Sequence, residues 1–299
     1  MLIYPSLAPL HISQTERRMP EGPEIRRMVD DIEAAIGGRD ADTVFFAFER
    51  YKGFESALGG RRVTAVEARG KAVLVFFAAL GGDGPWCVYS HNQLYGQWRI
   101  GRSDALPATK RQLRFAVTAE PRAARLYSAS DIRLIRPNAL GAVPYLARLG
   151  PDLLNDADVG DDRLAQQLDE ARFTGRALGG LLLDQGFIAG VGNYLRSEIL
   201  FVAGLHPARK PRSLTGHERA RLIASTRCMI ERAYRLNGIT NDPQRAQHLK
   251  TQGKRFSERR HMVFGRAGQA CYDCGAGIEK SIVASRRLYR CPHCQPAPS

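Results

Sequence analysis

The first clear pattern of apolar positions in the chain is helical. Between residues 23 and 36, apolar side chains recur at the three- and four-residue spacing of an amphipathic helix. Pro23 suits the first turn of this helix, and Gly37-Gly38 follows its last apolar residue. Short apolar stretches bounded by glycine-rich turns come next, as is typical of strands. They cover residues 44–48, 62–67, 72–77, 86–89, 97–100, 113–118 and 125–128. Such a series of short strands predicts a β-sandwich.

Helical patterns dominate after the turn at residues 149–152, so we place a domain border near residue 150. Helices are predicted around Leu164 and Leu168, at residues 177–185 and at residues 193–202, with Gly204 as the stop of the last. Thr215 and Glu218 have the spacing of a capping box and predict the start of another helix. Residues 237–262 are polar and basic without a clear period, and we interpret them as a long linker or loop.

The charge of the chain is concentrated at one end. The 299 residues include 44 Lys and Arg against 30 Asp and Glu, and residues 200–299 hold 19 of these cations against 6 of the acids. Such a basic third indicates a polyanion partner, although a solubilising surface is the alternative. The longest apolar run, residues 72–80, is too short to span a membrane. Prolines interrupt the first 18 residues, so we expect no secretory signal and a cytoplasmic protein.

Two Cys-x-x-Cys pairs near the C-terminus have the spacing of a metal site. The four residues are Cys271, Cys274, Cys291 and Cys294. This spacing lets two turns present four thiolates to one tetrahedral zinc ion, which then has no open position for water and is structural. Two redox pairs are the alternative. Cys87 and Cys228 stand among apolar residues and are interpreted as core residues.

Two other segments place polar groups at predicted helix starts. A glycine-rich turn, residues 186–192, precedes Asn193 and exposes backbone N–H groups that suit an anion, although a tight corner is the bland alternative. The segment Met19-Pro20-Glu21-Gly22-Pro23-Glu24 places two carboxylates beside the first amphipathic helix, where ordinary helix capping is the alternative.

In order along the chain, these motifs resemble the endonuclease VIII branch of the formamidopyrimidine-DNA glycosylase family. The resemblance runs from Met19 to about Gln295. It rests on residues 19–24, 69–71 (Arg-Gly-Lys), 91–96 (His-Asn-Gln-Leu-Tyr-Gly), 127–131 (Tyr-Ser-Ala-Ser-Asp) and 190–196 (Gly-Val-Gly-Asn-Tyr-Leu-Arg), and on the four cysteines. It implies an α+β fold with an N-terminal β-sandwich domain with flanking helices (19–149), a helix-two-turn-helix DNA-binding domain (150–261) and a zinc-finger hairpin (262–296) that holds one structural Zn²⁺.

The activity implied by this resemblance is that of a monomeric DNA glycosylase and abasic-site lyase of base excision repair, acting on double-stranded DNA with oxidised bases or abasic sites. Pro20 matches the family's N-terminal proline, whose free amine attacks the sugar after removal of the initiator Met. Glu21 matches its acid–base partner, and Glu24 is similar to a second carboxylate near the site. Lys71 matches the lysine assigned to β-elimination, and Arg286 the zinc-finger arginine that holds phosphate and assists δ-elimination.

Gln93, Arg148 and Asn193 match DNA-contacting positions of the family. Gln93-Leu94-Tyr95 also reads as a turn with a bulky apolar tip, which suits filling the gap left by a flipped base. The alternative is a hairpin tip that packs on its own sheet. Because the contiguous triplet resembles the endonuclease VIII branch, it favours oxidised pyrimidines such as thymine glycol and dihydrouracil.

The 18 residues before Met19 depart from the family pattern. Acylation would make the Pro20 nitrogen a tertiary amide without nucleophilicity, so we expect Met19 to be the true start. Residues 1–18 are then a disordered extension that is removed, or a mis-assigned start. Two alternatives stay open, namely a glycosylase for oxidised purines and a catalytically silent damaged-DNA-binding protein. Residues 81–85 look like a small tolerated insertion between strands.

Overall fold

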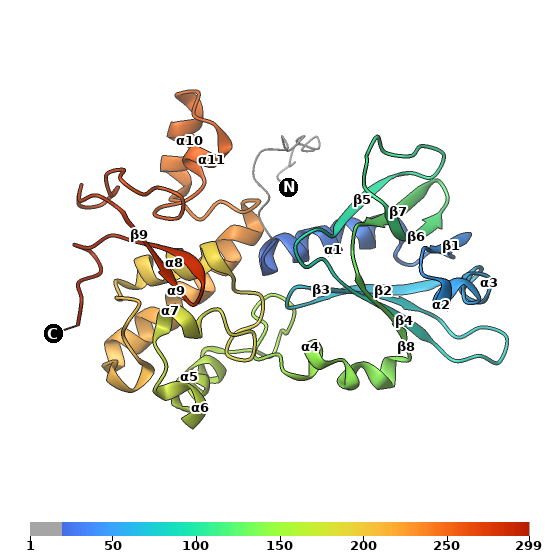
Figure 1. The fold of residues 1–299 in the computed structure, drawn as a ribbon, viewed down its shortest axis with the longest axis horizontal. Coiled ribbons are helices and arrows are strands. Elements are labelled where there is room, and N and C mark those ends of the chain that lie inside the picture. The colour runs from blue at the N-terminus through green and yellow to red at the C-terminus, as the bar shows by residue number, and fades with distance from the viewer. Residues whose placement is uncertain (1–19, 299) are drawn as a thin grey trace, which may run out of the picture.

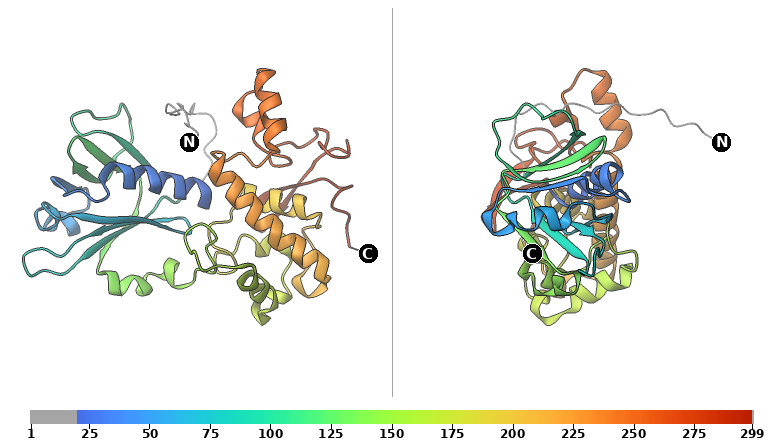
Figure 2. Two further views of the ribbon diagram at one scale, coloured as in Figure 1. Left: turned by 180° about the vertical axis from the view of Figure 1, so that it is seen from behind. Right: turned by 90° about the vertical axis from the view of Figure 1, so that its right-hand side faces the viewer.

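The computed structural model describes residues 20–298, so the expectations for residues 1–18 and for Met19 lie outside the described residues. Figure 1 shows two lobes side by side, one built around β-sheets and one built mainly of helices. Each lobe has its own buried apolar cluster, residues 25–132 in the first and residues 164–291 in the second. The view from behind in Figure 2 shows the same division.

The first lobe contains two four-stranded antiparallel sheets that enclose a common core. Their strand orders are β1-β6-β7-β5 and β2-β3-β4-β8. The strands are β1 (Thr43–Phe46), β2 (Val63–Arg69), β3 (Ala72–Phe77), β4 (Trp86–His91), β5 (Gln97–Arg102), β6 (Leu113–Ala119), β7 (Arg122–Tyr127) and β8 (Asp131–Ile135). Helix α1 (Gly22–Ile36) buries Ile25, Val29 and Ile32 against the same core. The predicted β-sandwich is therefore confirmed, although β8 was not foreseen in the sequence.

Short helices and one small hairpin complete this lobe. The helices are α2 (Glu49–Lys52), α3 (Glu55–Leu58), η1 (Pro137–Ala142) and α4 (Pro144–Ala147). Residues 81–85 form a turn between β3 and β4, closed by a bridge between Leu80 and Asp83. The Asp83 carboxylate accepts hydrogen bonds from Arg61, Arg136 and the indole N–H of Trp86. The inserted turn is thus tied to the sandwich, at the opposite end of β3 and β4 from Lys71 and Gln93.

In the second lobe, the longer helix α9, several short helices and a hairpin surround one buried helix, α8. Its elements are α5 (Asp161–Asp169), α6 (Ala171–Thr174), α7 (Leu178–Leu181), α8 (Asn193–Ala203), η2 (Pro211–Ser213), α9 (Gly216–Arg235), α10 (Pro243–Thr251), α11 (Phe256–Arg259), β9 (Glu279–Val283) and β10 (Arg286–Arg290). Gly204 adopts the left-handed conformation that ends α8, and Thr215 and Glu218 form the expected capping box. Within residues 20–298, no helix has the length and apolar character needed to cross a membrane.

Three sequence-based expectations for this lobe were wrong. The helix predicted at 177–185 is a single turn, α7. The side chain of Asp184 accepts from the backbone N–H of Gly186, and that of Gln185 bonds Gly190 and Val191, so both residues bind the turn that follows instead of continuing a helix. The segment 237–262, interpreted as a linker or loop, contains α10 and α11. Helix α10 buries only Ala246, so it shows no apolar stripe in the sequence. Cys228, interpreted as a core residue, is exposed on α9.

Candidate active site between the two lobes

The buried carboxylate of Glu21 joins the two lobes. Glu21 is the residue before α1, and its side chain is 4% exposed. Its carboxylate accepts hydrogen bonds from the backbone N–H groups of Tyr194 at 2.8 Å and Leu195 at 3.3 Å, in the first turn of α8. The anion held by the N-terminus of α8 is therefore a side chain of the other lobe.

Glycines allow this close approach. The backbone N–H of Gly22 donates to the carbonyl oxygen of Gly190 at 2.8 Å. A Cβ atom on Gly192 would lie 2.4 Å from Cδ of Glu21, and one on Gly22 would lie 2.9 Å from Cα of Gly190. The glycine-rich turn is thus more than a tight corner, because a side chain at residue 192 would displace the carboxylate.

The surroundings of Glu21 raise its pKa toward neutral pH. Burial raises the pKa of Glu21 to about 7, with a smaller contribution in the same direction from Glu24. The positive charge of Lys71 and the two backbone N–H groups act in the opposite direction and lower the pKa. A carboxyl group with such a pKa can both donate and accept a proton at neutral pH, as general acid–base catalysis requires.

Lys71 lies beside this carboxylate. It follows Gly70, which has a φ of 59° in the tight turn between β2 and β3. The Lys71 Nζ donates to the carbonyl oxygen of Val191 at 2.8 Å, so its side chain crosses to the second lobe. Burial lowers the pKa of Lys71, the negative charge of Glu21 raises it, and the positive charge of Arg286 lowers it. Arg286, exposed at the start of β10, therefore belongs to the same electrostatic neighbourhood.

The carboxylate of Glu24 is occupied by contacts within the protein. It accepts hydrogen bonds from the hydroxyl of Tyr194 at 3.0 Å, from the guanidinium of Arg260 and from the backbone N–H of Glu21. The guanidinium of Arg260 also lies 4.8 Å from the centre of the Tyr194 ring. Glu24 thus links α1 to the second lobe through α8 and the end of α11.

His91 and Tyr145 lie in the same region, and neither was assigned a role from the sequence. The Lys71 backbone N–H donates to the Tyr145 hydroxyl at 2.8 Å, and the rings of His91 and Tyr145 are 4.8 Å apart. Burial lowers the pKa of His91, Asp131 raises it, and the charges of Lys71 and Arg148 lower it. Sheet register could have pointed to His91, because it pairs with Ala72 in β3 and so lies next to Lys71. The exposed Arg148 lies within this group of charges.

The loop at residues 93–96 presents an apolar tip to solvent. Leu94 is 51% exposed and Tyr95 is 54% exposed. Gln93 has a φ of 49°, its backbone N–H donates to His91 Nδ1 at 3.0 Å, and its side-chain oxygen accepts from Ser130. The exposure of both apolar side chains agrees with a tip available to a partner rather than one packed on its own sheet.

The four paired cysteines gather at the base of the β9–β10 hairpin. Their sulfur atoms all lie within 4.8 Å of one another, and Cys271 and Cys291 are buried. Four sulfurs at about 2.3 Å from a tetrahedral ion lie about 3.8 Å apart, so this cluster fits one structural metal ion. The same hairpin carries Arg286, and its buried residues Leu288 and Tyr289 belong to the core of the second lobe. A metal ion at this cluster would therefore stabilise the β9–β10 hairpin, which carries Arg286.

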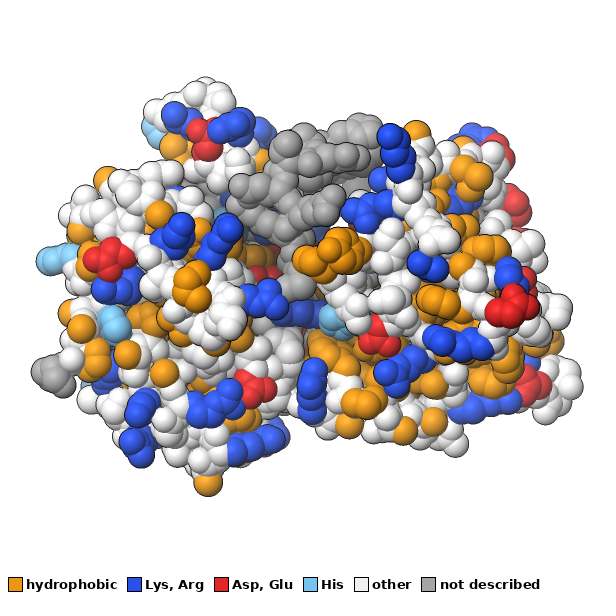
Figure 3. All heavy atoms as spheres, in the orientation of Figure 1, with side chains coloured by type: hydrophobic (Ala, Val, Ile, Leu, Met, Phe, Trp, Pro, Cys, Tyr) orange, Lys and Arg blue, Asp and Glu red, His pale blue; other side chains and the backbone are white. Residues whose placement is uncertain are grey.

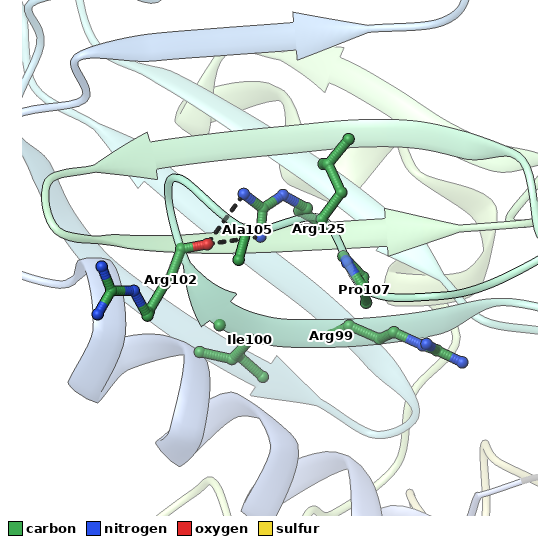
Figure 4. A pocket seen from close by; sticks show the side chains of 8 residues that line it. Arg99, Ile100, Arg102, Ala105, Pro107 and Arg125 are labelled. Carbon is green, nitrogen blue, oxygen red and sulfur yellow. Dashed lines mark hydrogen bonds between the residues drawn. The ribbon is translucent and has the colours of Figure 1, made fainter.

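A separate pocket of about 250 Å³ lies over β5 and the loop that follows it. Figure 4 shows Arg99, Arg102 and Arg125 around this pocket. The guanidinium of Arg125 donates to the carbonyl oxygens of Arg102 and Ser103, and that of Arg102 pairs with Asp104. Because Arg102 and Arg125 already have partners within the protein, this pocket is a weaker candidate for the active site than the hollow between the lobes. On the face shown in Figure 3, Lys and Arg side chains border that hollow.

Comparison with known proteins agrees with this geometry. Residues 19–135 match the model of the formamidopyrimidine-DNA glycosylase N-terminal domain, and residues 149–244 match that of the formamidopyrimidine-DNA glycosylase H2TH domain. The chain is 42% identical over 280 residues to endonuclease 8 of Enterobacter sp. (strain 638), covering 93% of this chain and 100% of the relative. It is 43% identical over 277 residues to endonuclease 8 of Salmonella heidelberg (strain SL476), with the same coverage.

Solved structures share the fold at lower sequence identity. The Lactococcus lactis Fpg in complex with DNA containing an abasic site is 22% identical, with a TM-score of 0.72, covering 93% of this chain and 100% of that one. MutM in complex with DNA containing carbocyclic 8-oxo-G gives a TM-score of 0.73 at 22% identity, with the same coverage.

Proposed function

The chain belongs to the formamidopyrimidine-DNA glycosylase family of DNA glycosylases and abasic-site lyases, and we propose that it removes oxidised pyrimidines, such as thymine glycol and dihydrouracil, from double-stranded DNA. The observation that carries the catalytic part of this proposal is the buried carboxylate of Glu21, which follows Pro20 in the chain and accepts from the Tyr194 backbone N–H at 2.8 Å; burial raises its pKa to about 7. Identity of 42–43% to endonuclease 8 proteins supports the pyrimidine branch.

In the proposed mechanism, the nucleophile is the secondary amine of Pro20 at the mature N-terminus. An α-amine titrates near pH 8, so a usable fraction is unprotonated at neutral pH. Its lone pair attacks C1′ of the damaged nucleotide as the sugar ring opens, and protonated Glu21 supplies the proton that the ring oxygen gains. The Pro20 nitrogen, which became positively charged on attack, then loses its proton, and its lone pair forms the C=N bond as the glycosidic bond breaks. The base leaves with its bonding electrons and takes up that proton, and the sugar stays on Pro20 as an iminium ion.

Strand cleavage follows by two eliminations. Loss of a C2′ proton expels the 3′ phosphate, and a second elimination expels the 5′ phosphate; water then releases the sugar fragment from Pro20. We assign Lys71 to the first elimination because its amine lies beside Glu21 and its pKa is lowered by burial. Arg286 is assigned to phosphate binding during the second elimination.

Further residues are proposed to hold the DNA. Gln93, Leu94 and Tyr95 fill the gap left by the flipped nucleotide, because their tip is exposed and bulky. Arg148 and Asn193 bind phosphates near the abasic sugar. The four-cysteine cluster is proposed to hold one structural Zn²⁺ through four thiolates, and the protein is proposed to act as a monomer.

One alternative is a glycosylase for oxidised purines, supported by the shared fold with Fpg bound to DNA containing Fapy-dG. Faster release of 8-oxoguanine opposite cytosine than of thymine glycol would favour it. The other alternative is a silent damaged-DNA-binding protein, which would bind abasic DNA tightly without forming a covalent adduct.

The test is borohydride trapping on a thymine-glycol duplex, with protein begun at Met1 compared with protein begun at Met19 and the intact mass of each recorded. We expect an adduct only from the Met19 form after loss of that Met, because only then is the Pro20 amine free. A Lys71→Ala variant of the Met19 form is the control and is expected to retain trapping. Equal trapping by both forms would show that another amine is the nucleophile.

A further inference from the structure

Arg196 is a fully buried cation that ties three segments of the second lobe together. It lies one turn into α8, with 0% of its side chain exposed. One guanidinium nitrogen donates to the carbonyl oxygens of Gly179 at 2.8 Å and Val283 at 3.0 Å. The other donates to Asn193 Oδ1 at 2.7 Å and to the Arg287 carbonyl oxygen at 3.0 Å. The Arg196 side chain thus connects α8 with α7 and with both strands of the β9–β10 hairpin.

This charge is expensive to bury. Among the residues that the structure describes, the hydrogen-bond acceptors of Arg196 are backbone carbonyls and one side-chain amide, with no carboxylate. Burial lowers its pKa to about 10. An apolar side chain at this position would leave the carbonyl oxygens of Gly179, Val283 and Arg287 without this donor, so the guanidinium is a fixed part of the junction.

The hydrogen bond to Asn193 fixes the direction of that side chain. Because the amide oxygen of Asn193 accepts from Arg196, its NH₂ group must point the other way. Asn193 is half-buried at the first position of α8, so the NH₂ group is the part left to donate outward. Without Arg196, the two ends of the amide could exchange, and an oxygen could then face a DNA phosphate.

Arg196 also holds both sides of the hairpin turn that carries Arg286. Val283 and Arg286 are opposite each other in the β9–β10 register and flank Ala284 and Ser285, which have φ values of 50° and 59°. Arg196 bonds Val283 on one strand and, on the other, Arg287 and more weakly Arg286 at 3.5 Å. The position of the Arg286 backbone is therefore set by the same guanidinium that orients Asn193.

We infer that Arg196 is a positioning residue that aligns the Asn193 amide and the Arg286 guanidinium as one clamp on a DNA phosphate. This inference rests on the proposed function of Asn193 and Arg286. Its main effect falls on phosphate binding and on the second elimination. Imine formation depends instead on Pro20 and on Glu21, whose carboxylate is held by the backbone N–H groups of Tyr194 and Leu195 and not by the Arg196 guanidinium.

The test uses DNA with a preformed abasic site, so that base recognition does not enter. The variants are Arg196→Met, which keeps most of the volume, and Arg196→Lys, which keeps the charge but not the fork. For Arg196→Met we expect the ratio of δ- to β-elimination product to fall about tenfold or more, with borohydride trapping changed by less than about threefold. Arg196→Lys should lie between this variant and the wild type.

Arg61→Met is the control, because Arg61 is also buried, at 3% exposed, and donates to backbone carbonyls and to the Asp83 carboxylate within the sheet-containing lobe. It should lower thermal stability without moving the product ratio. A double variant, Arg196→Met with Arg286→Ala, should lose little more of the δ product than Arg286→Ala alone, because the first residue acts through the second. Zinc content is measured for each protein.

Product ratios within about twofold of the wild type for both Arg196 variants would overturn the inference. If Arg196→Met fails to fold or to retain zinc, Arg196→Lys decides alone by the same ratio. Full additivity in the double variant would also overturn it, since it would show that Arg196 does not act through Arg286. Failure of the wild type to trap would instead refute the proposed function itself.

Discussion

The carboxylate of Glu21, on the sheet-containing lobe, accepts a 2.8 Å hydrogen bond from the backbone N–H of Tyr194, on the helical lobe. This contact places the carboxylate at the positive end of α8 and removes it from water. Burial dominates and raises the pKa of Glu21 to about 7. The proton affinity of the proposed catalytic acid is thus set by the contact between the lobes.

The rate of base release should have a narrow pH optimum. Glu21 must be protonated to act as an acid, so activity should fall as pH rises through about 7. The Pro20 amine must be unprotonated, so activity should also fall as pH drops below the α-amine pKa near 8. Single-turnover release of thymine glycol, measured across pH, should be bell-shaped. A profile that stays flat on the alkaline side would contradict the role of Glu21.

Replacing Glu21 by Gln should stabilise the protein at alkaline pH. Because the folded pKa lies above the unfolded value of 4.5, the folded state loses stability as pH rises from about 4.5 through 7. The loss amounts to about 3 kcal/mol above pH 7. Glu21→Gln removes this loss, so its advantage in the free energy of unfolding should grow between acidic and alkaline pH. Denaturant titrations check this, with the exposed Glu49→Gln as control.

Gly192→Ala should lower activity far more than stability. The added Cβ would lie 2.4 Å from Cδ of Glu21 and push the carboxylate from the start of α8. We expect a loss of base release of about 100-fold, similar to the loss of a general acid. Gly160→Ala is the control, since Gly160 also precedes a helix but a Cβ there meets nothing within 4 Å. Equal activity of the two variants would show that the Glu21 position is unimportant.

Truncation of the exposed loop tip should weaken flipping of the damaged base without lowering the stability of the free protein. Leu94→Ala and Tyr95→Ala remove half-exposed side chains, so melting temperatures should stay near the wild-type value. Base flipping, followed by the fluorescence of 2-aminopurine opposite the lesion, should weaken. Leu106→Ala, at a residue 77% exposed in the loop after β5, is the control and should flip the base normally.

Loss of one paired cysteine should remove the metal and the δ-elimination product together. Cys274→Ser breaks the four-sulfur set, and the buried Cys271, Cys291 and Leu288 link that set to the core of the second lobe. We expect elemental analysis to find one zinc per wild-type chain and less in this variant, with weaker binding to abasic DNA. Cys228→Ser, at an exposed cysteine outside the cluster, should retain both.

Local signals in the sequence were sufficient for the elements whose ends and faces are chemically marked. Helix α1 has an apolar stripe, α9 has a capping box, and the four cysteines have ligand spacing, and all three were predicted. Helix α10 was missed because it buries only Ala246 and therefore shows no stripe. Its Asp242 cap and Pro243 start were the available signals.

The candidate site itself was only partly visible in the sequence. Glu21 and Glu24 fit ordinary capping of α1, and the structure does show that capping box. What the sequence could not show is that the Glu21 carboxylate also reaches Tyr194, or that Lys71 reaches Val191, because these contacts depend on how the lobes meet. The catalytic roles proposed for Glu21 and Lys71 came from the resemblance to a known family, whereas the local sequence pattern alone favoured helix capping by Glu21.

The contact between Glu21 and α8 also has a consequence for the order of synthesis. Glu21 and Tyr194 are separated by 173 positions in the chain. At typical elongation rates, Glu21 is therefore synthesised roughly 10 to 30 s before Tyr194. During that interval an emerging chain has the Glu21 carboxylate in water, without the burial that raises its pKa. A nascent or prematurely terminated chain that lacks α8 therefore also lacks the burial that raises the pKa of Glu21, and the proposed acid would be ionised at neutral pH.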